Sequence, residues 1–113
     1  MSGISTHILD TSTGCPATGI GLSLLRQVDN EWQTLTTAKT DNDGRCRQLL
    51  PKDTALVPGK YRVRFETAAY YEAHSLKGLY PFIEITFTVH EGDEHLHIPL
   101  LLTANGYTTY RGS

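Results

Sequence analysis

The chain has 113 residues, a formal net charge of −2, and 10 Lys or Arg against 12 Asp or Glu. This length predicts one domain, residues 1–113, large enough to bury a core without disulfides or a metal. The basic residues are scattered, no apolar run approaches the length of a membrane span, and no secretory leader is visible. These features argue against nucleic-acid and membrane partners and predict a cytoplasmic protein.

Period-two alternation of apolar and polar residues predicts strands along most of the chain. The expected strands cover residues 4–10, 20–27, 32–37, 61–66, 83–89, 95–102 and 107–111. Thr67 is the predicted N-cap of one short helix over 68–74. Turn signals about every eight to twelve residues, without a visible parallel crossover, predict an all-β, antiparallel β-sandwich of seven to eight strands.

Two prolines mark places where strand pairing is expected to stop. The turn-rich segment 10–16 ends in Pro16, which has no amide donor, so we expect no ladder there. Pro99 lies inside the strand 95–102, so one side of that strand is expected to be an edge or locally unpaired. The same strand carries Leu101 on its outward face, and this apolar surface indicates a symmetric oligomer.

Three side chains from distant stretches are candidates for chemistry. His7 and His97 face away from the core sides of their strands, and Arg45 follows a concentrated turn signal at the mouth of an extended segment. Histidine exchanges a proton near neutral pH, so it can activate water. Arginine offers a planar fork of donors that suits carbonyl oxygens or an anion.

Plainer interpretations of these residue types remain open. Arg45 after a tight turn is ordinarily a surface charge. The histidines expected to be simply solvated are His74, His90 and His95. A catalytic zinc site is also possible, with the ligands His7, His95 and His97. Cysteine spacing predicts two separate reduced thiols, at Cys15 and Cys46.

Four stretches carry a resemblance to a known family. They are residues 6–10 with 14–17, then 40–45, 97–102 and 107–113, the last reading Tyr-Thr-Thr-Tyr-Arg-Gly-Ser. With these residues the chain resembles the transthyretin-like 5-hydroxyisourate hydrolases over essentially its full length. The hormone carrier transthyretin shares that fold but has other residues at the positions of His7, Arg45 and His97, and it lacks the closing tetrapeptide. Two small departures, at 95–97 and 102–104, touch no residue with an expected chemical role.

The resemblance implies hydrolysis of 5-hydroxyisourate to 2-oxo-4-hydroxy-4-carboxy-5-ureidoimidazoline in urate degradation, without metal or cofactor. The residues it implies for catalysis are His7, Arg45, His97 and Ser113. It implies that the same four residues also bind substrate, together with Tyr110 and Arg111. It also implies a homotetramer, a dimer of dimers with active sites at the dimer–dimer interface.

Other functions remain alternatives to this one. One is a transthyretin-type protein that binds small molecules without turnover, and another is a metal-dependent hydrolase. Ser113 as a covalent nucleophile is disfavoured, because no Gly-x-Ser-x-Gly elbow is present.

Overall fold

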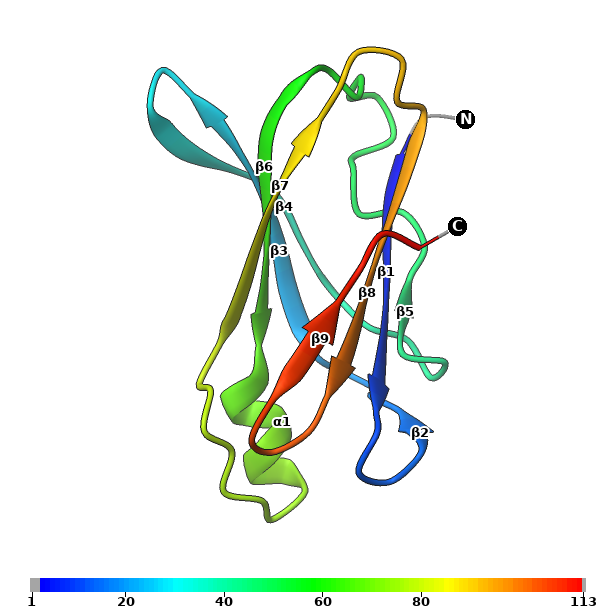
Figure 1. The fold of residues 1–113 in the computed structure, drawn as a ribbon, viewed down its shortest axis with the longest axis vertical. Helices are drawn as coiled ribbons and strands as arrows, with labels where there is room; N and C mark the ends of the chain where they lie inside the picture. The colour runs from blue at the N-terminus through cyan, green and yellow to red at the C-terminus, as the bar shows by residue number, and fades with distance from the viewer. Residues whose placement is uncertain (1–2, 113) are drawn as a thin grey trace.

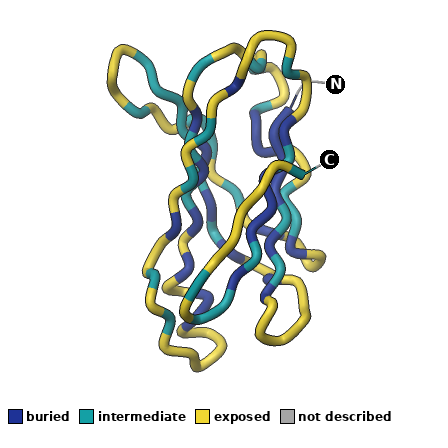
Figure 2. Tube along the Cα trace, viewed as in Figure 1, coloured by how far each residue is buried: buried dark blue, intermediate teal, exposed yellow. Residues whose placement is uncertain are grey.

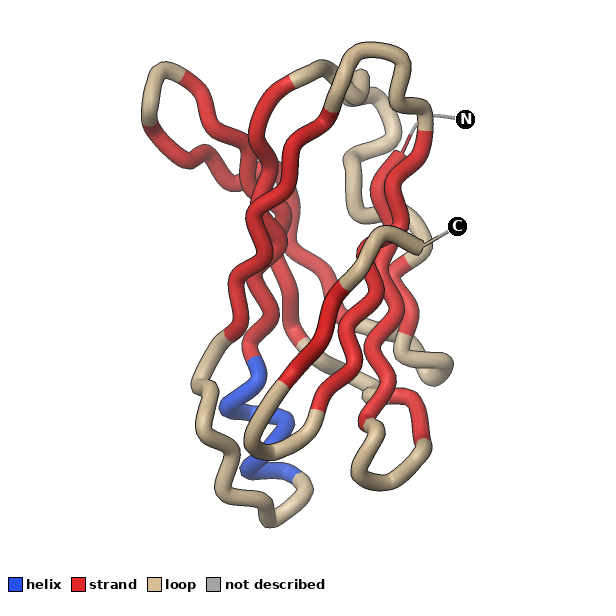
Figure 3. The backbone as a smooth tube through the Cα atoms, in the orientation of Figure 1, coloured by secondary structure: helices blue, strands red, loops and turns tan. Residues whose placement is uncertain are grey.

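The computed structural model describes residues 3–112, which form two β-sheets with a short helix at one end (Figure 1, Figure 3). In chain order the elements are β1 (Gly3–Asp10), β2 (Cys15–Pro16), β3 (Gly21–Val28), β4 (Glu31–Lys39), β5 (Arg45–Cys46), β6 (Gly59–Glu66), α1 (Thr67–Ala73), β7 (Ile83–Val89), β8 (His95–Leu102) and β9 (Tyr107–Thr109). The predicted all-β class with one short helix is confirmed.

Neighbouring strands within the two sheets are antiparallel, as predicted, except at one pair. One sheet has the order β2-β1-β8-β9, with β5 also paired to β1, and the other has the order β4-β3-β6-β7. β1 and β8 run parallel, with Gly3 opposite His95 and Asp10 opposite Leu102. The expectation of purely antiparallel pairing is wrong here. β1 and β8 come from opposite ends of the chain, so local turn signals carry no information about their relative direction.

The facing sides of the two sheets form one apolar core. Side chains alternate along each strand, so every second residue points inward. Buried positions accordingly lie mainly along the strands of both sheets, while most of the loop residues are exposed (Figure 2). The most completely buried residues, all at 0 % exposure, include Ile4, Ile8, Leu24, Val63, Phe65 and Leu100.

The segment after β1 pairs back onto β1, contrary to the sequence prediction. Cys15 lies opposite Asp10 and Pro16 opposite Leu9 in a short antiparallel hairpin. β2 is the terminal strand on its side of the sheet, and at an edge a missing amide donor removes no ladder bond. The edge position is therefore why Pro16 is compatible with a strand.

Pro99 coincides with a gap in the pairing of β8, as the sequence predicted. β9 ends at Thr109, so the expected strand 107–111 is shorter than predicted. The ladder resumes only at an isolated bridge between His97 and Gly112. Across the gap, the Thr109 hydroxyl donates a 2.8 Å hydrogen bond to the Pro99 carbonyl. The C-terminal segment is thereby held against the strand that carries His97.

Helix α1 begins at Thr67, and the predicted N-cap role of that residue is wrong. Glu66 occupies the N-cap position without a side-chain cap. The Thr67 hydroxyl instead donates a 2.6 Å hydrogen bond to the Tyr80 carbonyl. Tyr70 ties the helix to β1 by donating to an Asp10 carboxylate oxygen at 2.7 Å. No helix formed by residues 3–112 has the length and apolar character needed to cross a bilayer.

Candidate active site

A hollow of about 270 Å³ opens on the sheet that contains β1, β5 and β8. β1 lies between β5 and β8, so side chains of three strands meet on one face. The wall of the hollow consists of Ser5, Thr6, Arg45, Arg47, His95 and His97. Two of the predicted site residues, Arg45 and His97, are therefore brought together from distant parts of the chain.

Arg45 is positioned by the turn that precedes it. Gly44 has a φ of +72°, and a Cβ added there would lie 2.5 Å from the Ile8 carbonyl oxygen. Only glycine combines this backbone conformation with so close an approach. Asp41 accepts a 2.9 Å hydrogen bond from the Arg45 amide through its Oδ1. The turn thereby docks on β1 and places Arg45 opposite His7.

His97 is held by one contact to its ring and one to its backbone. On one side, the Ser5 hydroxyl oxygen lies 2.8 Å from Nδ1. On the other, the Gly112 amide donates a 2.8 Å hydrogen bond to the His97 carbonyl. A Cβ on Gly112 would lie 3.1 Å from the ring carbon Cγ and closer still to Cδ2. Glycine therefore makes room for the ring, and Nε2 remains the nitrogen available to other partners.

The pKa of His97 lies below its ordinary value. Burial is the main cause, because desolvation disfavours the charged imidazolium, and the charges of Arg45, His7 and His95 act in the same direction. The lowered pKa favours the neutral imidazole. A neutral imidazole next to a fixed guanidinium is the combination required for a general base beside an oxyanion-stabilising donor.

His7 belongs to the same neighbourhood but not to the wall of the hollow. It is half-buried on β1, and its backbone lies directly opposite Arg45. Its charge also contributes to the lowered pKa of His97. The hollow itself is lined by other residues, so the structure places His7 beside the pair formed by Arg45 and His97.

Tyr110 and Arg111 are not brought into this hollow. Both line a second hollow of about 230 Å³, whose wall includes residues of β7, β8 and β9. Tyr110 is 56 % exposed, and the Arg111 guanidinium lies 3.4 Å from an Asp93 carboxylate oxygen. Ser113 lies outside the residues that the structure describes. Their predicted roles in binding and catalysis stay predictions.

Sequence reasoning missed Ser5 and Arg47 and misjudged the surroundings of His95. Alternation along 4–10 does place Ser5 on the same face as His7. The missing information is the register of β1 and β8, which sets Ser5 opposite His97. His95, expected to be merely solvated, is exposed but hydrogen-bonded, with Nε2 2.9 Å from the Ser5 hydroxyl.

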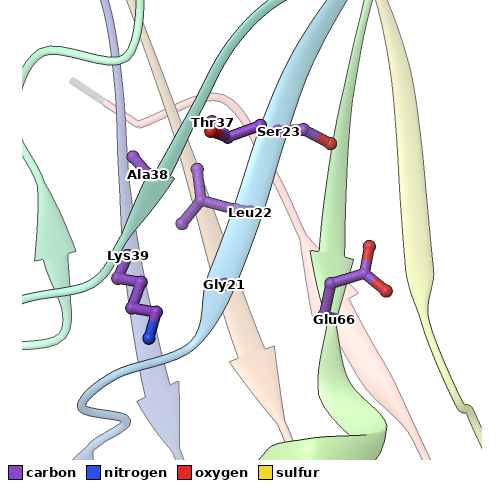
Figure 4. A pocket seen from close by; sticks show the side chains of 7 residues that line it. All are labelled: Gly21, Leu22, Ser23, Thr37, Ala38, Lys39 and Glu66. Atoms are coloured by element: carbon purple, nitrogen blue, oxygen red, sulfur yellow. The ribbon is translucent and has the colours of Figure 1, made fainter.

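Two other observations concern a metal site and a second hollow as alternatives to this site. Within residues 3–112, no three His, Cys, Asp or Glu side chains are placed to hold one metal ion, so the considered set of three histidines is not assembled there. A larger hollow, of about 430 Å³, lies on the other sheet (Figure 4). Its charged side chains, among the part of the chain that is described, are Lys39 and Glu66 on either side of Gly21. It therefore lacks a group that exchanges protons near neutral pH.

Comparison with known proteins identifies the family. Residues 4–112 match the model of the HIUase/Transthyretin family. The chain belongs to this family. A 5-hydroxyisourate hydrolase of Salmonella dublin is 46 % identical over 110 residues, which are 97 % of this chain and 80 % of that protein.

Solved structures of both hydrolases and transthyretins in the HIUase/Transthyretin family resemble this chain. Klebsiella pneumoniae 5-hydroxyisourate hydrolase has a TM-score of 0.86 at 36 % identity, covering 100 % of both chains. Sea bream transthyretin in complex with thyroxine has a TM-score of 0.89 at 31 % identity, covering 96 % of this chain and 93 % of that chain. Because a hydrolase and a transthyretin resemble this chain to a similar degree, a functional assignment has to rest on the side chains of the site.

Proposed function

We propose that this protein hydrolyses 5-hydroxyisourate to 2-oxo-4-hydroxy-4-carboxy-5-ureidoimidazoline, a step of urate degradation. The observation that carries the proposal is that His97 and Arg45 share the wall of one hollow. The 46 % identity to the Salmonella dublin hydrolase, across 97 % of the chain, supports the same reaction.

In the proposed reaction, His97 activates a water molecule. Nε2 takes a proton from the water as its oxygen attacks an amide-type ring carbonyl of the substrate. Arg45 donates hydrogen bonds to the carbonyl oxygen as negative charge develops on it. When the tetrahedral intermediate collapses, the ring C–N bond breaks and the imidazolium returns its proton to the leaving nitrogen. The product equals substrate plus one water, and each step uses side chains of this protein.

His7 has a supporting role in this proposal. Its position opposite Arg45 on the neighbouring strand suits a group that orients the water or holds the flat substrate ring. Tyr110, Arg111 and Ser113 complete the substrate pocket in the proposal, with Ser113 donating or relaying a hydrogen bond.

The assembly we propose is a homotetramer, a dimer of dimers whose active sites lie at the dimer–dimer interface. The outer face of β8 supports this, because Leu101 is only half-buried in the single chain and an apolar strand face favours a partner. A monomer then has an incomplete site. Size-exclusion chromatography combined with the activity assay tests this, and a fully active monomer would refute it. The cytoplasmic location stays a prediction that cell fractionation tests.

The decisive experiment generates 5-hydroxyisourate in situ from urate with urate oxidase. Its ultraviolet decay is followed with and without the protein and with and without a chelator. We expect acceleration that survives the chelator and is lost in His97→Asn and Arg45→Ala. Removing a general base or an oxyanion donor each costs on the order of 100-fold or more. No acceleration by the folded oligomer would overturn the proposal.

A small-molecule carrier is the second candidate, favoured by the TM-score of 0.89 to thyroxine-bound sea bream transthyretin. Under that function His7 and His97 variants change affinity but there is no turnover. Calorimetry with aromatic ligands, run beside the hydrolysis assay, separates the two. Loss of activity with the chelator would instead indicate a metal-dependent hydrolase.

A further inference from the structure

Ser5 links the two histidines of β8. Its hydroxyl oxygen lies 2.8 Å from Nδ1 of His97 and 2.9 Å from Nε2 of His95. Ser5 is 8 % exposed, so bulk water competes little for these bonds. We propose that Ser5 is a positioning residue which, together with His95, determines which ring nitrogen of His97 carries the proton. This inference rests on the proposed function and deepens it.

When the Ser5 hydroxyl proton lies in one of the two contacts, the hydrogens can be arranged in two ways. A serine hydroxyl donates once and accepts through its lone pairs, and a neutral imidazole has one N–H. In the first arrangement, His97 donates from Nδ1 to Ser5, and Ser5 donates to Nε2 of His95. Nε2 of His97 then has a free lone pair. In the second arrangement every donor is reversed, and Nε2 of His97 carries the proton.

The first arrangement is the one that serves catalysis. Only there can Nε2 of His97 take a proton from water. The resulting imidazolium keeps its Nδ1–H bond to Ser5, while the Ser5 hydroxyl continues to donate to His95. In the second arrangement the Ser5 hydroxyl donates to Nδ1 of His97. A proton added to Nδ1 would then point at the hydroxyl proton, and the hydroxyl would have to rotate. The first arrangement therefore needs no reorganisation during the reaction.

His95 influences the tautomer of His97 even though the His95 side chain is exposed and takes no part in the proposed reaction steps. Its Nε2 accepts the hydroxyl proton and so keeps the Ser5 lone pair directed at His97. Without His95 the hydroxyl is free to donate to Nδ1 of His97, which favours the unproductive tautomer. Partners that orient metal-ligating histidines in this way change metal affinity or activity by about 10- to 100-fold, and we expect an effect of this order here.

The kinetic test uses variants that separate the hydroxyl from its surroundings. For Ser5→Ala we expect kcat to fall at least about tenfold with KM nearly unchanged. Ser5→Thr keeps the hydroxyl and suits a strand, so it should retain most of the wild-type kcat. His95→Ala should lie between wild type and Ser5→Ala, and the double variant should be no slower than Ser5→Ala, because the two residues act as a unit. His74→Ala, an exposed histidine on the helix side, is the matched control and should behave as wild type.

A spectroscopic readout tests the same inference without turnover. Nitrogen-15 NMR of the ring distinguishes a protonated Nδ1 from a protonated Nε2. We expect His97 to carry its proton on Nδ1 in the wild type and in Ser5→Thr, and to change toward the other tautomer in Ser5→Ala and His95→Ala.

Several results would overturn the inference. One is a wild-type His97 protonated on Nε2, and another is a Ser5→Ala variant with wild-type kcat. A loss of kcat without a change of tautomer, or additive losses in the double variant, would reduce Ser5 to a structural residue. Because the tautomer is measured without substrate, failure of this inference is distinguishable from failure of the hydrolase proposal, which shows as an inactive wild type.

Discussion

Replacing Gly112 with alanine tests whether the C-terminal segment positions the base. A Cβ at this position would lie 3.1 Å from Cγ of His97, closer to Cδ2, and 3.2 Å from Cγ of Pro99. Carbon atoms in ordinary contact are about 3.5–4.0 Å apart, so the ring or the segment has to move by about 1 Å at the tightest point. A misplacement of this size can reduce a rate by about 100-fold.

We therefore expect Gly112→Ala to lower kcat by about 100-fold while the fold survives. If the segment moves away instead of the ring, the 2.8 Å hydrogen bond from the Gly112 amide to His97 is lost. That loss costs about 1 kcal/mol, a small change in a urea unfolding curve. The assays are the decay of 5-hydroxyisourate for kcat and urea unfolding for stability.

Gly106→Ala provides the matched control in the turn between β8 and β9. Its added Cβ would meet only Thr103 Oγ1, at an ordinary 3.7 Å, and neither Gly106 nor Gly112 has a positive φ. The control should keep wild-type kcat. Wild-type kcat in Gly112→Ala would refute the reasoning, as would equal losses in the two variants, because the effect would then not come from the contact with His97.

Three other predictions follow from the site and its support. Arg45→Gln removes a charge that lowers the pKa of His97, so the acid limb of the kcat/KM profile should move to higher pH while the maximum falls by about 100-fold or more. Tyr70→Phe removes the 2.7 Å hydrogen bond to Asp10 and should cost about 1.5–3 kcal/mol of unfolding free energy at pH 7 by urea unfolding. Gly44→Ala should destabilise by more than about 1 kcal/mol and lower kcat/KM, because the turn that carries Arg45 can no longer dock on β1.

The sign of the pH dependence at Asp10 follows from its pKa. Burial raises that pKa, but hydrogen bonds from Ser12 and Tyr70 outweigh burial and leave it below the ordinary value. The ionised carboxylate therefore stabilises the fold above its unfolded-state pKa, and this stability is lost as pH falls through the folded-state value. The cost of Tyr70→Phe should shrink over the same range. A cost independent of pH would contradict this role of the charge.

The predictions for Gly44→Ala and Arg45→Gln each have an outcome that would contradict them. Gly14 has the same φ of +72° as Gly44, but an added Cβ there meets nothing within 4 Å. Gly14→Ala thus measures backbone strain alone, and equal destabilisation of both variants would contradict the steric argument. For Arg45→Gln, an acid limb that stays in place or moves to lower pH would mean that His97 is not the group titrating.

The strands and their faces could be predicted from the sequence because side-chain alternation is local. Ile4 and Ile8 lie inward and His7 outward for the same period-two reason. Turn chemistry acts over similarly few residues, which is why Gly44 correctly predicted that Arg45 begins an extended segment. Pro99 likewise predicted a break in pairing from the lack of a single amide donor.

The relations between distant strands could not be read in this way. Ser5 and His97 are opposite each other only because β1 and β8 pair in parallel in one particular register. Gly112 touches His97 only because the ladder resumes beyond the gap at Pro99. Local patterns specify which face a side chain takes but not the strand that will lie beside it.

The sequence by itself thus determined the class of fold, the candidate pair Arg45 and His97, and the resemblance to a hydrolase family. Tertiary structure alone decided that these two share one hollow, that Ser5 joins His97 to His95, and that the pKa of His97 is lowered. The physical reason is that desolvation and the fields of neighbouring charges depend on distances in space, which follow from long-range packing and register.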